Sequence, residues 1–286
     1  MKKYFFLMRL DRPVGFMLLF WPCAWGFAII SSQRPMDSNW LVYLILFFVG
    51  SILMRSAGCV YNDIIDQKID QKVRRTKFRQ IASGKVSICE AWVLAIFLSL
   101  LSLLILFQFN LKAIIFGLSS GILIILYPFM KRITYWPQLF LGIVFNWGVI
   151  LSYLVFNDKI NLEISLIYFS AILWTLGYDT IYGLQDIYDD IRIGVKSTSI
   201  KFKKNIKQFL TTVYMLSFSL IFIVSILITK ETGIFFIFYL LPFFLLVYQI
   251  QSVEISKNEK NLSLFKLNNY YGLSIFLIQI FIFNYA

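Results

Sequence analysis

Residues 40–70 of the chain are WLVYLILFFVGSILMRSAGCVYNDIIDQKID. The first part, Trp40–Val60, is almost entirely apolar and has the length of about 20 residues that a helix needs to cross a bilayer. The stretch then ends in a polar cluster that contains Asn62, Asp63, Asp66 and Asp70. This pattern predicts a membrane-spanning helix that presents carboxylates at one of its ends.

A second apolar segment, Leu162–Leu184, ends in the same way about 120 residues later. Its cluster consists of Asp179, Asp186, Asp189 and Asp190. The two clusters hold seven of the 15 carboxylates in the chain. Because acidic side chains are costly at a membrane, such clusters indicate a functional site. A weak repeat of this kind places the site between the two halves of a membrane protein.

The composition predicts an all-α, polytopic membrane protein. The chain is 59% hydrophobic and only 15% charged, its mean hydropathy is +0.75, and a soluble domain has about 25% charged residues. We expect one domain over residues 1–286, with about nine membrane-spanning helices in one bundle. The predicted spans are Pro13–Ser32, Trp40–Val60, Ile88–Phe109, Ala113–Met130, Pro137–Phe156, Leu162–Leu184, Phe209–Ile228, Gly233–Ile250 and Tyr270–Tyr285.

The distribution of Lys and Arg predicts the orientation of these spans. With the N-terminus inside, the inner segments hold 22 of the 27 cations, and Arg55 lies within a span. The outer segments hold the remaining four, which are Arg34, Lys112, Lys159 and Lys230. This asymmetry follows the positive-inside rule and places both acidic clusters on the cytoplasmic side. The net charge of +12 is therefore mainly a signal of topology.

Several classes of function are excluded by composition. The chain has no His, and Cys23, Cys59 and Cys89 form no CxxC pair, so zinc, haem and His-based acid–base chemistry are not expected. Nucleic-acid binding is also not expected, because the inner loops are too short to form a separate basic face.

The spacing of the acids favours a metal site over a solvated surface. Asn62, Asp66 and Asp70 recur every four residues, which places them on one helical face, and Asp186 and Asp190 have the same spacing. Mg²⁺ binds such oxygen donors together with water and phosphate oxygens. We therefore predict a Mg²⁺ site that holds a diphosphate. The alternative is that these are solvated loop acids beside basic residues.

Basic side chains near the acids are candidates for binding the diphosphate. Arg55 lies two helical turns before Asn62, inside a span, where it requires an anionic partner. The other candidates belong to segments that follow spans, and each is alternatively a simple topology signal: Arg75, Arg79, Lys131, Arg132 and Lys196. Several aromatic residues near the acids are candidates to shelter a carbocation by cation–π attraction, although core packing is the alternative for each. They are Tyr61, Tyr178, Tyr182, Trp136 and Trp147.

These motifs resemble the UbiA superfamily of intramembrane prenyltransferases. The superfamily has an N-D-x-x-D-x-x-x-D motif, matched by Asn62–Asp70, and a D-x-x-x-D motif, matched by Asp186–Asp190. The resemblance is closer to the 4-hydroxybenzoate polyprenyltransferase branch and covers residues 9–198. Its further hallmarks here are Arg9-Leu10-Asp11-Arg12-Pro13, Met54-Arg55-Ser56-Ala57-Gly58-Cys59, Tyr127-Pro128-Phe129, Lys131-Arg132, Asn146-Trp147-Gly148 and Gly194-x-Lys196-Ser197. The branch usually has Arg-Pro-Leu where this chain has Arg79-Gln80-Ile81.

The resemblance implies a specific reaction. A bundle of nine helices around a cavity that opens sideways to lipid would transfer a polyprenyl group from polyprenyl diphosphate to 4-hydroxybenzoate, with Mg²⁺, in ubiquinone biosynthesis. In this interpretation Asn62, Asp66, Asp186 and Asp190 bind the metal, Asp70 and Asp179 support them, and Asn146 joins the substrate pocket. The implied location is a bacterial inner membrane.

Two alternatives remain at this stage. The first is a related prenyltransferase with a naphthoate, homogentisate or porphyrin acceptor. The second is a cation-coupled transporter, because intramembrane acids between repeated halves occur there too. Transporter acids usually lie near the bilayer midplane, whereas these acids lie at one edge beside dense cations.

The charge asymmetry makes a testable prediction of topology. Reporter fusions should place the N-terminus in the cytoplasm and the C-terminus outside, because nine crossings separate them. Reporter signals from both termini on one side of the membrane would mean an even number of crossings and would contradict the prediction.

Overall fold

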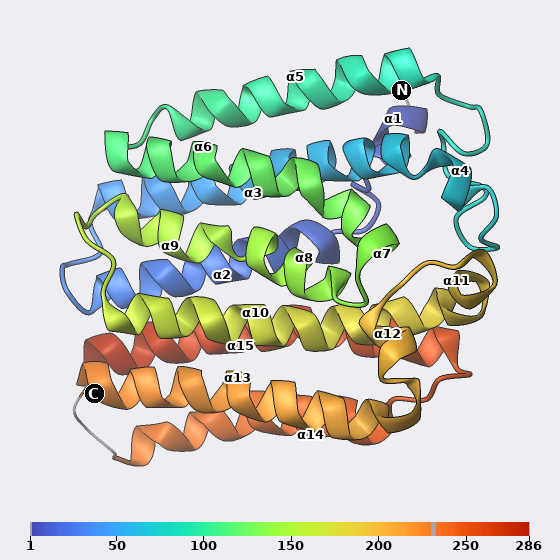
Figure 1. Ribbon diagram of the computed structural model, residues 1–286. Helices are drawn as coiled ribbons and strands as arrows, with labels where there is room; N and C mark the ends of the chain where they lie inside the picture. The colour runs from blue at the N-terminus through green and yellow to red at the C-terminus, as the bar shows by residue number, and fades with distance from the viewer. Residues whose placement is uncertain (1, 230–232, 286) are drawn as a thin grey trace.

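The computed structural model describes residues 2–229 and 233–285, and the helices run roughly parallel across the molecule (Figure 1). No β-strand occurs among these residues. The bounds are α1 Lys2–Leu7, α2 Val14–Ser31, α3 Ser38–Ile65, α4 Gln67–Asp70, α5 Ile88–Leu106, α6 Leu111–Leu126, η1 Tyr127–Phe129, α7 Met130–Ile133, α8 Pro137–Phe145, α9 Trp147–Leu154, α10 Leu162–Gly183, η2 Leu184–Asp186, α11 Ile187–Ile193, α12 Thr198–Lys201, η3 Lys203–Asn205, α13 Ile206–Thr229, η4 Ile234–Tyr239, α14 Leu240–Ser252 and α15 Asn258–Tyr285.

Polar side chains begin several of the long helices. Asp37 caps α3 by accepting a hydrogen bond from the backbone N–H of Trp40, and Asn110 and Asn161 cap α6 and α10 in the same way. Ser87 begins α5 with a reciprocal capping box to Glu90. Each cap satisfies a backbone N–H that the first helical turn leaves without a partner.

The predicted membrane protein is confirmed, with a span count close to the prediction. Eight helical stretches in the described part of the chain are long and apolar enough to cross a bilayer. The predicted ninth span, Tyr270–Tyr285, is the apolar half of α15, a helix of 28 residues that begins at Asn258. Helix α15 lies against α10 and extends along the bundle (Figure 1). Lys230, one of the four predicted outer cations, lies outside the described residues.

Two of the predicted spans are interrupted. The span that contains α6 breaks at the 3₁₀ turn η1, which includes Pro128 and leads into α7. Proline cannot donate the backbone hydrogen bond that a continuing α-helix needs. The span Pro137–Phe156 consists of α8 and α9, which meet at Asn146. Both breaks leave helices short of a full crossing, with polar backbone at the joint.

Helix α2 lies inside the bundle, whereas α6 lies at its surface. Of the stretches that can cross a membrane, α2 has the largest buried share at 72%, and the stretch that contains α6 has the smallest at 11%. The exposed apolar side chains of α6 include Leu111, Ile115, Leu118 and Ile122. An apolar surface of this kind suits contact with lipid rather than water.

A buried hydrogen-bond network joins α10, α13, α14 and α15. The indole of Trp174 donates to Asn268 (2.8 Å), and Asn268 donates to Gln249 (2.8 Å). The hydroxyl of Tyr214 also donates to Gln249 (3.0 Å). All four side chains are buried. Paired with one another, these polar groups avoid the cost of an unsatisfied group in an apolar interior.

The two acidic clusters lie at one end of the bundle. Helices α4 and α11, which carry parts of these clusters, lie at the right-hand end of Figure 1, where the chain also begins, and the C-terminus lies at the other end. A smaller core cluster supports α3 at the acidic end and includes Leu7, Val60, Ile81 and Val86.

The close contact between α2 and α9 generates a stability prediction. A Cβ atom at Gly26 would lie 2.1 Å from Ser152 Oγ and 2.7 Å from the backbone carbonyl oxygen of Val149. Gly26→Ala should therefore force the helices apart and lower the free energy of unfolding by about 1–3 kcal/mol. The measurement is the melting temperature of the purified protein in detergent.

The matched control is Gly121→Ala in α6, where nothing lies within 4 Å of an added Cβ. Its melting temperature should be unchanged or slightly raised, because alanine favours the helix over glycine. Equal melting temperatures for the two variants would contradict the proposed tight contact.

Candidate functional site

The first acidic cluster lies where α3 ends. Asp66 has a non-helical backbone (φ −96°, ψ 4°), and the chain turns there into α4. The second cluster has a similar break, because the 3₁₀ turn η2 ends at Asp186 before α11 begins. Each cluster therefore extends over a break between two helical segments. Its acids do not lie on one face of a single straight helix, as the spacing predicts.

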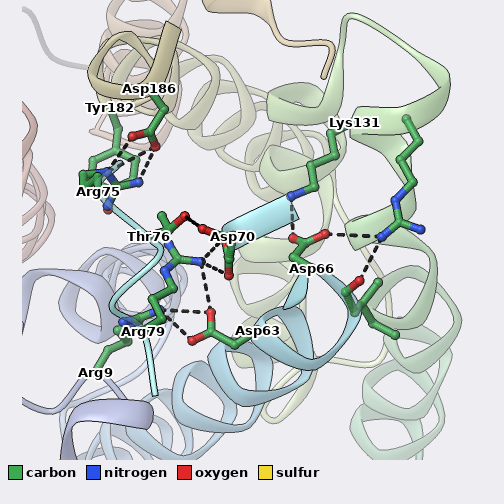
Figure 2. A network of polar contacts seen from close by, with 12 residues as sticks. Arg9, Asp63, Asp66, Asp70, Arg75, Thr76, Arg79, Lys131, Tyr182 and Asp186 are labelled. Carbon is green, nitrogen blue, oxygen red and sulfur yellow. Dashed lines mark hydrogen bonds and ion pairs between the residues drawn. The ribbon is translucent and has the colours of Figure 1, made fainter. Parts of the chain in front are cut away.

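Arg79 connects two carboxylates of the first cluster (Figure 2). Its Nη1 atom donates to Asp63 Oδ1 (3.1 Å) and to Asp70 Oδ2 (2.9 Å). Arg9 holds Asp63 from the other side, at 2.8 and 2.9 Å from the two carboxylate oxygens. Both aspartates are buried. Arg79, predicted to bind diphosphate, thus also ties α3, α4 and the loop of residues 71–87 together.

Asp66 faces the two basic residues of α7. Lys131 Nζ lies 2.5 Å from Asp66 Oδ2, and Arg132 Nη2 lies 3.5 Å from Oδ1. Arg132 also donates to the carbonyl of Ile65 (2.9 Å). Asp66 is 1% exposed, and its Oδ1 atom accepts no hydrogen bond. Burial raises the pKa of the Asp66 carboxyl, and the charge of Lys131 opposes this shift.

Arg75 connects the loop of the first cluster to the second cluster. Its Nε donates to Asp186 Oδ1 (2.8 Å), and its Nη1 donates to the hydroxyl of Tyr182 (3.0 Å; Figure 2). The backbone N–H of Arg74 donates to Asp189 (2.9 Å). Two regions more than 100 residues apart in sequence therefore form one polar surface.

Asp190 differs from the other acids of the site. Its carboxylate forms no ion pair or hydrogen bond within residues 2–229 and 233–285, yet the charges of Asp186, Lys131 and Arg75 all act on it. Lys131 and Arg75 belong to the pairs that hold Asp66 and Asp186. The two acidic clusters are therefore electrostatically coupled through shared cations.

A cavity of about 580 Å³ extends from this polar end into the bundle. Its polar lining includes Arg55, Asn62, Asp63, Arg79 and Asp179. The rest of the lining is mostly apolar and comes from α2, α3, α5, α6, α8, α9 and α10; it includes Phe47, Leu106, Phe109, Leu141 and Phe145. The predicted opening of the cavity to lipid remains a prediction.

Arg55 enters this cavity from the middle of a span. Its Nε is buried without a hydrogen-bond partner, and its guanidinium lies 5.5 Å from the centre of the Phe145 ring. A Cβ atom at Gly15 would lie 2.9 Å from this Nε, so glycine leaves the room that the side chain needs. A buried cationic group with an unused donor is suited to an anionic ligand.

Not every predicted site residue lies at the cavity. Tyr182 and Trp147 line it, and Trp147 stacks on Phe116. Asn146 is fully buried behind the lining, because its amide donates to the carbonyls of Gly142 and Ala171 and to Thr175 Oγ1. Its predicted place in the substrate pocket stays a prediction that this buried position does not support. In the structure the side chain stabilises the joint between α8 and α9.

Lys196 also lies away from the acids. Its Nζ donates to the carbonyl of Ile133 (3.0 Å) and lies 5.8 Å from the centre of the Tyr135 ring. The structure gives it no contact with the carboxylates, so the prediction that it binds diphosphate receives no support from its position.

Sequence reasoning did not assign a role to three residues at the site. Arg9 and Asp63 form one of its buried ion pairs, and Tyr127 lines the cavity. Arg9 and Tyr127 belong to motifs that the chain shares with the UbiA superfamily, so the sequence contains a signal for them. Helical spacing alone directs Asp63 to a different face from Asn62, so it gives no signal for Asp63.

The donor set fits a hard divalent cation. In the part of the chain that the structure describes, no three acids or cysteines gather at one point, since Arg and Lys separate them. The donors present are carboxylate and amide oxygens, which suit Mg²⁺ better than Zn²⁺. The buried Asp66 Oδ1 atom, which accepts no hydrogen bond, provides an unused ligand position.

The fold and the site define a class of protein. It is a multi-pass helical membrane protein whose apolar cavity ends in carboxylates, arginines and lysines, an arrangement that suits ligands with an anionic head and an apolar tail. The UbiA prenyltransferase family model matches residues 19–270. The chain belongs to the UbiA prenyltransferase family.

Curated relatives have similar sequences. The chain is 47% identical over 211 residues to a mitochondrial 4-hydroxybenzoate polyprenyltransferase of Drosophila melanogaster, covering 73% of this chain and 53% of the relative. It is 37% identical over 275 residues to a 4-hydroxybenzoate octaprenyltransferase of Histophilus somni, covering 96% and 94%. The chain spans about half the length of the insect and plant relatives that it matches.

Solved structures have the same fold. A UbiA homologue from Aeropyrum pernix superposes with a TM-score of 0.74 at 24% identity, over 91% of this chain and 94% of that one. A UbiA homologue from Archaeoglobus fulgidus, bound to GPP and Mg²⁺, has a TM-score of 0.64 at 18% identity, over 96% and 99%.

Proposed function

We propose that this protein transfers a polyprenyl group from polyprenyl diphosphate to the aromatic ring of 4-hydroxybenzoate, with Mg²⁺, in ubiquinone biosynthesis. The proposal includes a location in a bacterial inner membrane, with the acidic end of the bundle facing the cytoplasm. The similarity to the Histophilus somni octaprenyltransferase, which extends over nearly the whole of both chains, supports it.

The observation that carries the proposal is the contrast between the two parts of the cavity. Carboxylates and cations lie at one end, where a diphosphate and its metal ion would bind. Apolar side chains line the remainder, where an isoprenoid chain would avoid water. The acids lie at one edge of the bundle rather than at its midplane, which disfavours the transporter alternative.

The metal would be held by Asn62, Asp66, Asp186 and Asp190, with Asp70 beside them. When bound, Mg²⁺ neutralises charge on a diphosphate and so makes it a better leaving group. Lys131, Arg132, Arg75 and Arg79 already lie beside these carboxylates. We expect them to contact diphosphate oxygens and to stabilise the charge that develops there.

The remaining residues of the cavity would serve the prenyl group and the acceptor. Tyr182 and Trp147 line the cavity, and we expect their aromatic rings to stabilise positive charge on the allylic carbon. The ring carbon beside the phenol hydroxyl attacks this carbon as its bond to the diphosphate oxygen breaks. The apolar lining excludes water, which would otherwise capture the carbocation.

The direct experiment uses the purified protein with Mg²⁺, a polyprenyl diphosphate and a panel of aromatic acids. We expect prenylation of 4-hydroxybenzoate in preference to naphthoate or homogentisate. Preferential turnover of another acceptor would keep the enzyme class and change the substrate.

Loss of a metal-binding carboxylate should abolish most of the activity. Asp66→Asn and Asp186→Asn should each lower kcat at least about 100-fold, the scale for losing a group that stabilises charge in a transition state. Excess chelator should have a comparable effect on the wild type. Product formation from a radiolabelled polyprenyl diphosphate measures both effects.

The matched control is Asp158→Asn. Asp158 is an exposed carboxylate that pairs with Lys112 between α9 and α10, away from the acidic end. This variant should retain wild-type turnover. Normal turnover in either site variant, or full activity in chelator, would exclude the proposed metal site.

Arg55 should not be replaceable by lysine. A lysine ammonium lacks the planar fork by which a guanidinium binds two oxygens of one anion, so Arg55→Lys should insert normally but raise KM for the diphosphate donor or lower kcat. Steady-state kinetics with each substrate varied in turn measures this effect.

Two variants control for general charge effects. Arg34→Lys makes the same exchange at a side chain whose guanidinium donates to the carbonyl of Phe156, and Lys204→Ala removes an exposed cation. Both should leave the kinetics unchanged. If Arg55→Lys is equally silent, Arg55 is structural. If only KM for the aromatic acid rises, Arg55 binds the acceptor rather than the donor.

A further inference from the structure

Asp179 lines the cavity but belongs to none of the ion pairs that occupy its polar end. It lies on α10, two turns before Asp186 and one turn before Tyr182. Across the described residues its carboxylate forms neither an ion pair nor a hydrogen bond, and the charge that acts on it is that of Arg55. The resemblance implies that Asp179 supports the metal ligands, and the structure places it among the residues that line the cavity.

Most of the other carboxylates of the site are paired with cations. Asp63 and Asp70 are held by Arg79, Asp66 by Lys131, and Asp186 by Arg75. Asp190 has no such partner, but it does not line the cavity. Asp179 is therefore the carboxylate that faces the cavity without a basic side chain bound to it.

The surroundings of Asp179 are suited to an aromatic acceptor. Arg55 and Tyr127 line the same cavity, and the charge of Asp179 acts on Tyr127. The guanidinium of Arg55 and the carboxylate of Asp179 therefore lie near each other without forming an ion pair. Two charges left apart in an apolar cavity are costly, and such a cost is typical of groups kept for a ligand.

We infer that Asp179 is the general base that removes the ring proton in the proposed reaction. The inference rests on the proposed function. The C–C bond forms between the prenyl carbon and the ring carbon beside the hydroxyl, while the C–O bond to diphosphate breaks and its electron pair leaves with the diphosphate. The ring then carries one proton too many at the attacked carbon.

Asp179 accepts that proton. The electrons of the broken C–H bond return to the ring, aromaticity is restored, and the carboxylic acid then gives its proton to water at the polar end of the cavity. A positioned base of this type typically contributes about 10²- to 10⁴-fold to the rate. The acids that hold the metal would be unsuited to the same task, because their oxygens are occupied.

The test combines Asp179→Asn with 4-hydroxybenzoate deuterated at both ring positions beside the hydroxyl. In the wild type we expect loss of the ring proton to be faster than cleavage of the diphosphate bond, so kcat should not depend on deuteration. In Asp179→Asn, kcat should fall about 100-fold or more, within the range for a lost general base, and a primary isotope effect should appear. A purely structural role would not produce the isotope effect.

Asp158→Asn is the control, with wild-type kcat and no isotope effect expected. If the Asn variant does not fold, Asp179→Glu replaces it, because the longer side chain keeps the charge and displaces the carboxylate. This variant should be slower than the wild type and should also show an isotope effect.

The possible outcomes separate this inference from the function on which it rests. An inactive wild type would overturn both. If the wild type is active, two results would overturn the role of Asp179 alone. One is full turnover in the Asp179 variants, and the other is a slower Asp179→Asn enzyme without an isotope effect. A rise in KM for 4-hydroxybenzoate without an isotope effect would make Asp179 a positioning residue.

Discussion

Two arginines of the loop between α4 and α5 hold the polar end of the bundle together. Arg79 joins Asp63 at the end of α3 to Asp70 in α4, and Arg75 reaches Asp186 before α11. These carboxylates are buried or largely buried, so removing either arginine would leave an uncompensated charge, which typically costs about 3–5 kcal/mol. The loop, both acidic clusters and the mouth of the cavity thus depend on the same few ion pairs.

The same charges serve stability and chemistry because of where they lie. In a hydrocarbon environment a carboxylate needs a cation or a metal ion beside it, and at the end of the bundle both water and substrate can reach it. Lys131 neutralises Asp66 in the structure and is one of the side chains proposed to contact the diphosphate. A site that keeps its acids paired with the protein's own cations avoids a concentration of like charge in the absence of substrate.

The sequence predicts the class of fold well, because hydropathy and charge asymmetry depend on the types of single residues. It predicts less well the position and role of a side chain that depend on contacts with distant residues. The beginning of α15 at Asn258 was missed because hydropathy penalises Asn261 and Asn268, although both are buried and hydrogen-bonded. Spacing grouped the acids correctly at one end. It could not reveal that Arg75 pairs with Asp186, that Asn146 lies behind the cavity wall, or that Asp179 lies in it, since each depends on contacts across the bundle.

The hydrogen-bond network among Trp174, Asn268, Gln249 and Tyr214 has a consequence for helix α10. Apolar helices in lipid can rotate or slide against one another at little cost in free energy, because their apolar faces make similar contacts in either position. A slip of one residue would turn α10 by about 100° about its axis. Trp174 lies on the same helix as Asp179 and Tyr182, so its bond to Asn268 fixes the angle at which those side chains meet the cavity. The orientation of this wall of the cavity therefore depends on hydrogen bonds on the opposite side of α10, made by side chains that do not line the cavity.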